Sequence, residues 1–255
     1  MSSFIFLGTG TSNGVPMIGC NCEVCTSLDP RDKHLRCSGY YTTQNGTRIL
    51  IDIGPDFRQQ ALANHITHID GILITHSHYD HIGGLDEVRQ INFIMRKPVD
   101  VYGNAEAIRD IESRFQYIFH PTQIGGGIPQ IVLHTIDDSP FTINNTTIAP
   151  LLVQHGVLSI LGYRIEDFAY ITDASAIPQS TVEKIRHIDT LVVNALRYKP
   201  HSTHFNLDQA LEFIALVQPR RAYLIHMTDA FLYARDSQKL PPGVFFAYDN
   251  LTLNW

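Results

Sequence analysis

The 255-residue sequence predicts an α/β protein, on two observations. Short apolar runs rich in β-branched and aromatic residues recur along the chain and are typical of buried strands. Segments with apolar residues at helical spacing lie between several of these runs. We expect strands over 3–7, 39–43, 47–52, 71–75, 99–102, 131–136, 147–153, 160–165, 168–172, 190–194, 221–225 and 244–247. We expect helices over 56–63, 85–95, 104–115, 178–186 and 207–217, with Pro55 and Pro178 in the first turns of two of them.

The composition is that of an ordinary globular protein, with 44% hydrophobic and 17% charged residues. No apolar run approaches the ~20 residues that span a bilayer. The first seven residues lack a basic start and a cleavage site and are typical of a strand, not of a signal peptide. The net charge of −6 argues against general nucleic-acid binding, which requires basic surface. We therefore expect one cytoplasmic domain, 1–255, without a membrane or nucleic-acid partner.

Four metal-binding side chains lie within six residues, directly after the apolar run 72–74. They are His76, His78, Asp80 and His81. Imidazole nitrogen suits zinc, iron or manganese, and a carboxylate adds negative charge that neutralises the ion. Polar loops are common, but they seldom carry ligands for two metals at this spacing. The run predicts a dinuclear metal site.

The H-x-H-x-D-H pattern resembles the signature of the metallo-β-lactamase superfamily. That superfamily takes its later ligands from a single His, an Asp and another single His, each at a strand end. This chain offers His155, Asp173 and His226, in that order and each after a strand-like run. The resemblance implies that the α/β fold is a four-layer αββα sandwich; the residue pattern alone gives only α/β.

The resemblance also implies how the ligands divide between two divalent metals. One metal would be bound by His76, His78 and His155, and the other by Asp80, His81 and His226. Asp173 would bridge the two together with a hydroxide. Zinc is the usual metal of His-rich sites, and manganese or iron would also suit these ligands.

The loop Gly19–Cys25 carries a second cluster, Cys20, Cys22 and Cys25. In a cytoplasmic protein, thiols this close together are more often metal ligands than disulfides. We expect this loop, within about 19–37, to bind one structural zinc, which takes four ligands. Cys37 is one candidate for the fourth ligand, and water is another.

The Cys loop, the glycine-rich segment 8–16 and Asp29–Asp32 together resemble the branch of the superfamily that includes phosphoribosyl cyclic phosphate phosphodiesterases. Members of that branch complete the zinc site with a His three residues after the last active-site His. This chain has Asp229 at that position, so the resemblance adds Asp229 as a third candidate. A carboxylate oxygen can bind zinc, with weaker affinity.

The expected reaction is hydrolysis of a small anionic phosphodiester, cyclic or ribosyl, because Asp80 is typical of the branches that hydrolyse phosphoesters. In related phosphodiesterases a His before a helix protonates the leaving oxygen. The match with Asn206–Leu207 favours His204 over His201 in that role. A proton donor at neutral pH needs a pKa near 7, which histidine supplies. Asp80, Asp173 and His204 are thus the expected catalytic residues.

Three other functions stay open. A transfer-RNA 3′-processing endonuclease shares the motif but needs a basic RNA-gripping insert. A thioesterase or lactonase would lack the equivalent of His204. A non-hydrolytic accessory protein of cofactor biosynthesis is the third.

Several smaller expectations complete the set. Arg31, Arg36 and Arg197 are candidate phosphate contacts. The loop 119–129, with His120, is a connector, a lid or a dimer contact, and a homodimer is expected only by analogy. The spacing G-x-G-x-x-x-G in Gly8–Gly14 misses the dinucleotide-binding pattern, so we expect a turn that passes close to the metal centre.

Overall fold

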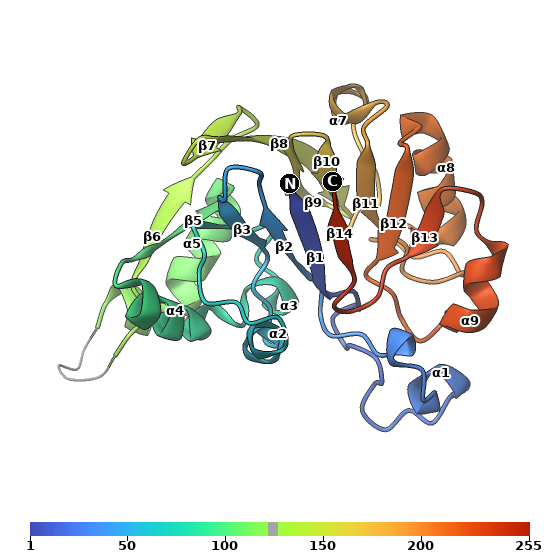
Figure 1. Ribbon diagram of the computed structural model, residues 1–255, viewed down its shortest axis with the longest axis horizontal. Coiled ribbons are helices and arrows are strands. Elements are labelled where there is room, and N and C mark those ends of the chain that lie inside the picture. Colours follow the sequence, from blue (N-terminus) through green and yellow to red (C-terminus); the bar gives the residue numbers. More distant parts are fainter. Residues whose placement is uncertain (122–126) are drawn as a thin grey trace.

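The computed structural model describes residues 1–121 and 127–255, which form two facing β-sheets with helices on both outer faces (Figure 1). In this part of the chain the first sheet has the strand order β14-β1-β2-β3-β4-β5-β6 and the second the order β13-β12-β11-β10-β9-β8-β7. The strands of the first sheet are β1 (Ser3–Gly8), β2 (Ser38–Thr42), β3 (Arg48–Ile51), β4 (Gly71–Leu73), β5 (Val99–Gly103), β6 (Ile131–Thr135) and β14 (Thr252–Asn254). Those of the second are β7 (Phe141–Ile143), β8 (Thr146–His155), β9 (Leu158–Ile165), β10 (Phe168–Tyr170), β11 (Thr190–Asn194), β12 (Arg221–Ile225) and β13 (Val244–Phe246).

Alternating side chains of the strands build the layers. Ile49 and Ile51 of β3 point between the two sheets, whereas Leu50 points outward beneath the helices. This follows from the two-residue period of a strand. Across the gap the rings of Phe4 and Phe168 lie 4.5 Å apart between centroids. Both residues are fully buried, and replacing such a side chain with Ala typically costs ~3–5 kcal/mol.

The helices cover the outer faces of the sheets. The larger ones are α2 (Phe57–Ala63), α4 (Val88–Met95), α5 (Ala105–Arg114), α7 (Gln179–Ile185) and α8 (Leu207–Val217). The first three share a buried cluster with the first sheet, and α7 and α8 share one with the second. The short helices are α1 (Glu23–Thr26), α3 (Tyr79–Ile82), α6 (Gln116–Phe119) and α9 (Tyr233–Asp236), with 3₁₀ turns η1 (Pro30–Asp32), η2 (Leu85–Glu87) and η3 (Ser237–Lys239).

The four-layer αββα prediction is confirmed, and the differences from the expected elements are local. The strands β7 and β14 were not expected, and each has only three residues. The expected helix 85–95 begins as the 3₁₀ turn η2 before α4. The first-turn positions of Pro55 and Pro178 are wrong. Pro55 lies in the turn before α2, and Pro178 is the extended N-cap residue of α7.

The parallel strands bring the ligand-bearing loops to one edge. Strands β3 to β6 run parallel to one another, as do β10 to β13. Loops that follow neighbouring parallel strands leave the sheet at the same end, where α/β proteins place their sites. Among the described residues, no helix is long and apolar enough to cross a membrane.

Candidate metal centres

The seven predicted ligands of the dinuclear site lie together at the ends of strands. The motif His76–His81 follows β4 and enters the short helix α3. His155 is the last residue of β8, Asp173 follows β10 by three residues, and His226 comes directly after β12. Asp173 and His226 have left-handed backbone, with φ of 57° and 58°, which turns the chain sharply at each strand end.

The side chains fall into overlapping groups that suit two metals. In each group the ligand atoms lie within 4.8 Å of one another; the groups include His76, His78 and His155 for one metal and Asp80, His81 and His226 for the other. A further group joins Asp173 to His76 and His81. This is the division that the resemblance implied, with Asp173 between the two halves. Metal binding itself stays a prediction.

Asp52 holds the centre in place and was missed by the sequence analysis. It follows β3, is fully buried and has a φ of 59°. Its carboxylate accepts hydrogen bonds from the backbone N–H and the hydroxyl of Thr75, each at 2.8 Å, and from Nδ1 of His81 at 2.7 Å. A carboxylate on the far nitrogen of a ligand His fixes its tautomer and strengthens it as a ligand. The available signal was a lone Asp at the end of an apolar run.

His81 provides the strongest sign that a cation belongs here. The Nδ1–H group of His81 donates a hydrogen bond to Asp52. Its other ring nitrogen, Nε2, is buried and has no hydrogen-bond partner among the described residues. This Nε2 lies 3.2 Å from Oδ2 of Asp80 and 3.4 Å from Oδ2 of Asp173. Burial would lower the pKa of His81, but the carboxylates of Asp80, Asp52 and Asp173 raise it well above its usual value. Two carboxylates around one buried nitrogen are stabilised by positive charge, which a divalent metal supplies. The residues therefore fit the divalent metal that the resemblance implies.

Asp173 connects the centre to His204. His204 Nε2 lies 2.9 Å from Oδ1 of Asp173, while Oδ2 of Asp173 lies 3.3 Å from Nδ1 of His226. Burial alone would raise the pKa of Asp173, but His226 and His81 hold it well below its usual value. The carboxylate is therefore ionised, and His204 faces the centre directly. His201, the alternative acid, contacts His204 from the outer side, with the two Nδ1 atoms 3.2 Å apart.

A cavity of about 370 Å³ opens over the centre. Besides the predicted ligands and His204, its described lining includes Ser12, Val157, Leu158 and Thr203. Ser12 comes from the glycine-rich loop, which does pass close to the centre as expected. Ser12 and Val157 were not predicted as lining residues: the glycine-rich loop was expected near the centre without any of its side chains being singled out, and Val157 lies outside every motif of the sequence. The cavity is of a size for a small substrate.

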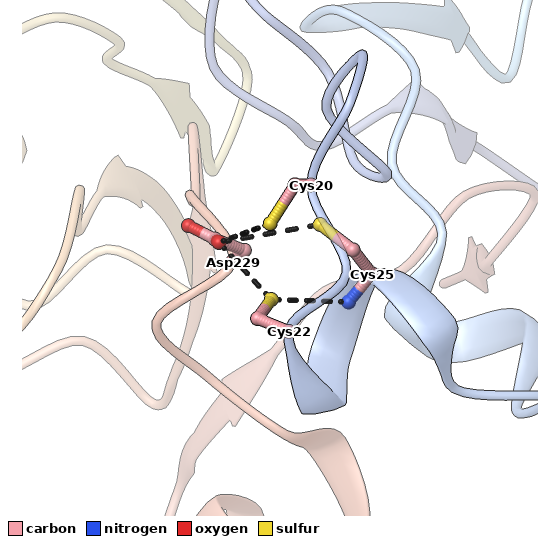
Figure 2. Close-up of side chains that lie close together, drawn as sticks. All are labelled: Cys20, Cys22, Cys25 and Asp229. Atoms are coloured by element: carbon pink, nitrogen blue, oxygen red, sulfur yellow. Dashed lines mark hydrogen bonds between the residues drawn. The ribbon is translucent and has the colours of Figure 1, made fainter.

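The three cysteines form the second cluster together with Asp229 (Figure 2). Oδ2 of Asp229 lies 3.2 Å from Sγ of Cys22, 3.5 Å from Cys20 and 4.0 Å from Cys25. Backbone N–H groups of Cys25 and Met17 donate to the sulfurs of Cys22 and Cys25, each at 3.4 Å. Three sulfurs and one carboxylate oxygen fit a four-ligand zinc site.

Cys37 is wrong as a fourth ligand of this cluster. The structure buries it between the two sheets, in the core that includes Phe6 and Tyr170, whereas Cys25 packs in a separate cluster. Burial raises the pKa of the Cys37 thiol well above its usual value, and nearby Asp173 adds to this. Cys37 is therefore a neutral thiol beneath the dinuclear centre. Asp229 is the side chain that meets the three sulfurs.

The three arginines suggested as phosphate contacts do not line the described part of the cavity. Arg31 pairs with Asp29 at 2.7 Å and stacks on the ring of Tyr233. Arg36 pairs with Asp56 at 3.1 Å, and Arg197 donates to backbone carbonyls of its own loop. The loop 119–129, expected to be a connector, a lid or a dimer contact, includes 122–126, which lie outside the described residues, so this expectation stays a prediction. His120 caps the end of α6.

Comparison with known proteins agrees with the fold. The family model of the beta-lactamase superfamily domain matches residues 47–227. The crystal structure of a new diphosphatase from the PhnP family is 38% identical, with a TM-score of 0.92 over 99% of this chain and 96% of that one. Zn²⁺-bound PqqB from Methylobacterium extorquens, at 17% identity, has a TM-score of 0.81 over 99% of this chain and 100% of that one, which shows the fold alone.

An octanoyltransferase of Porphyromonas gingivalis is 39% identical over 249 residues, which are 97% of this chain but 50% of that protein. The chain thus spans about half the length of this relative. Because the other half lies outside the match, the name of that protein carries no activity over to this chain.

The match of the family model to residues 47–227, which is more than half of the chain, shows that the chain belongs to the metallo-β-lactamase superfamily. Within that superfamily it belongs to the PhnP-like branch.

Proposed function

We propose that this protein is a dinuclear metal-dependent phosphodiesterase that hydrolyses a small cyclic or ribosyl phosphodiester, with His204 as the proton donor. The observation that carries the proposal is the position of His204. Its Nε2 lies 2.9 Å from the carboxylate of Asp173 and its ring lines the cavity, so a substrate held at the centre meets this nitrogen.

The chain's own residues divide the work. The seven predicted ligands would hold two divalent ions, which would supply an attacking water of lowered pKa and positive charge that neutralises phosphate oxygens. Asp80 and Asp173 supply the negative charge that binds these ions. As water attacks phosphorus and the bond to the alcohol breaks, Nε2 of His204 gives its proton to the departing oxygen. Histidine suits this step because its ordinary pKa lies near neutrality.

Three features support a small substrate and a cytoplasmic location. The cavity is small and lies against Val157 and Leu158, which offer an apolar wall to the organic part of the substrate. The similar PhnP-family structure is that of a diphosphatase, which also acts on a phosphorus centre. The sulfurs of Cys20, Cys22 and Cys25 gather around Asp229 as metal ligands would, an arrangement that suits a reducing compartment.

The test compares two leaving groups. An alkyl alcohol needs a proton to leave, whereas p-nitrophenolate does not. His204→Ala should therefore slow hydrolysis of an alkyl phosphodiester by ~10²–10⁴-fold, and that of bis(p-nitrophenyl) phosphate far less. Ser202→Ala, at an exposed position of the same loop, is the matched control and should show no such difference. Equal losses on both substrates in His204→Ala would refute the proton-donor role.

A further inference from the structure

Thr203 stands between a metal ligand and the proton donor. Its backbone carbonyl accepts a hydrogen bond from Nδ1 of His155 at 2.8 Å. Its hydroxyl lies 2.9 Å from Nδ1 of His204. The rings of His155 and His204 are themselves 4.7 Å apart between centroids, edge to face. One residue thus contacts the outward nitrogens of both rings.

The surrounding backbone fixes Thr203 against the end of β8. A Cβ added to Gly156 would come 2.8 Å from Cγ2 of Thr203, so the glycine lets the threonine approach. Gly156 also has a φ of 58°, in the left-handed region that favours glycine. On the other side the N–H of Phe205 bonds to the carbonyl of Ala174, next to Asp173. The segment 203–205 is therefore tied to two of the strand ends that carry predicted ligands, those of β8 and β10.

The start of α8 adds a second anchor just beyond this segment. Asn206 caps the helix by accepting from the N–H of Gln209 at 3.0 Å, and the side chain of Gln209 accepts from the N–H of Asn206 at 3.1 Å. This reciprocal capping box fixes the entry of the chain into the helix. His204 therefore has little freedom in its backbone, and the remaining freedom is rotation of its ring.

We propose that Thr203 is the positioning residue that holds the ring of His204 with Nε2 toward the leaving group, while its carbonyl holds His155. The inference rests on the proposed function, because Thr203 acts only through His204 as the proton donor. A hydroxyl both donates and accepts, so it can hold Nδ1 of His204 whether that nitrogen carries a proton or not. Nε2 then keeps its direction through the proton transfer.

The hydroxyl also contacts His201, whose Nδ1 lies 3.2 Å away. The backbone N–H of Thr203 lies 3.3 Å from the same nitrogen. His201 thus occupies the second hydrogen-bonding direction of the hydroxyl and keeps it aligned with His204. His201 thus helps to orient the hydroxyl of Thr203 and takes no part in the proton transfer itself.

Thr203→Val removes the hydroxyl and keeps the methyl group that packs against Gly156. We expect it to lower kcat for an alkyl phosphodiester by ~10-fold, with KM little changed and a loss of under ~3-fold on bis(p-nitrophenyl) phosphate. Thr203→Ser keeps the hydroxyl and should retain at least about a third of the alkyl rate. Ser202→Ala, at the exposed neighbouring position, is the matched control and should behave as the wild type.

Two readouts other than rate separate positioning from damage to the fold. Metal content per chain should be unchanged in Thr203→Val, because the partner of His155 is the backbone carbonyl. The ¹⁵N resonances of the His204 ring should shift in Thr203→Val and stay near wild-type values in Thr203→Ser. Equal losses on both substrates, loss of metal, or unchanged ring resonances would each overturn the assignment.

His204→Ala distinguishes a failure of this inference from a failure of the proposed function. If His204→Ala shows no difference between the two substrates, the proposed function is wrong, and the inference falls with it. If His204→Ala shows the difference but Thr203→Val does not, only the role of Thr203 is wrong.

Discussion

The two metal-ligand clusters of this molecule are held by different means. The His/Asp cluster lies at strand ends, is mostly buried, and has Asp52 and Thr203 behind its histidines. The Cys cluster lies on a loop that leaves the first sheet after β1 and returns at β2. Cys20 and Cys22 are partly exposed, Cys25 is buried, and all three sulfurs meet Asp229 from a distant part of the chain. The two sheets therefore fix the first cluster, whereas the second depends on its own ligands.

Polar contacts, more than an apolar core, bind the Cys loop to the rest of the protein. Asp32 accepts from the N–H of Tyr233 at 2.7 Å, and Glu23 pairs with Arg235 at 2.9 Å on the exposed surface. Exposed ion pairs of this kind contribute ~0–1 kcal/mol. Asp229 lies only three residues after His226, so the two clusters share one segment. The His/Asp cluster should therefore keep its metals when the Cys loop loses its own, because the two sheets hold the His/Asp cluster without help from the loop.

The largest expected effect is that of Asp80→Ala. It removes a charged ligand from the dinuclear cluster, and we expect hydrolysis to fall by at least ~10³-fold. The Cys cluster should keep its metal, since none of its ligands changes. Turnover of bis(p-nitrophenyl) phosphate and metal content per chain measure both effects. Full activity in this variant would remove Asp80 from the mechanism, and loss of the Cys-loop metal would contradict the independence of the clusters.

Asp52→Asn should have the next largest effect. The carboxylate of Asp52 accepts three hydrogen bonds on its two oxygens, from His81 and from the N–H and the hydroxyl of Thr75. An amide has only one acceptor oxygen and cannot accept all three. Loss of such a supporting carboxylate typically costs 10–100-fold in metal affinity or activity, and we expect about that loss. Metal titration of the apoprotein checks it. A wild-type affinity in the variant would show that Asp52 serves only the fold.

Asp229→Ala tests the other cluster. The Cys loop should then bind metal poorly, and we expect Tm to fall by ~4 °C or more because the metal no longer ties the loop to the segment after β12. Hydrolysis should change by less than ~3-fold, since the strand ends still hold the catalytic cluster. Asp229→His, which supplies a stronger zinc ligand, is the control and should keep the metal. A large loss of activity in Asp229→Ala with intact dinuclear metals would mean that the clusters are coupled.

Part of this contrast could be predicted from the sequence. Each expected ligand of the dinuclear cluster follows an apolar run, and strand ends are where sheets of this kind gather side chains. The role of His204 was implied by the resemblance to related phosphodiesterases, through its place before Asn206 and Leu207, which proved to be the cap and first residue of α8. The local sequence pattern was sufficient to predict a ligand wherever that ligand directly follows a strand.

The rest depended on contacts between distant residues. Asp52 acquires its role only because β3 and β4 pair in parallel and bring it beside Thr75 and His81. Asp229 reaches the cysteines across more than two hundred positions of sequence. No short window of sequence showed that Asp52 contacts Thr75 and His81, and Asp229 was a candidate only through the resemblance. The strands β7 and β14 have three residues each, which is too short for a periodic pattern to emerge.

The base of the Cys loop provides the smallest and most specific test. Asp249 accepts from the hydroxyl of Thr9 and the N–H of Leu35, each at 2.7 Å, and so joins the two ends of the loop. Burial raises the pKa of Asp249 to about 7, with a further contribution from Asp56. The unfolded chain has the ordinary carboxyl pKa, so the folded state binds more protons between about pH 4 and 7. This contribution to stability is present at low pH and is lost as pH rises through 7.

Between pH 6 and 8 the wild type should therefore lose about 1 kcal/mol more of its free energy of unfolding than Asp249→Asn. His34 contacts the same hydroxyl of Thr9, but burial lowers its pKa to about 4, so it stays neutral over this interval. Urea denaturation at both pH values gives the difference. Parallel losses in the two proteins would show that Asp249 is already ionised at pH 6.

The most direct test of the account is metal content in wild type and Cys22→Ser, purified without chelator and assayed for phosphodiesterase turnover. The account predicts about three metals per chain in the wild type and about two in Cys22→Ser, whose turnover stays within ~3-fold of the wild type. Two metals in both proteins would remove the Cys-loop site. Loss of all metal or of turnover in Cys22→Ser would contradict the claim that the two sheets hold the catalytic centre independently of the loop.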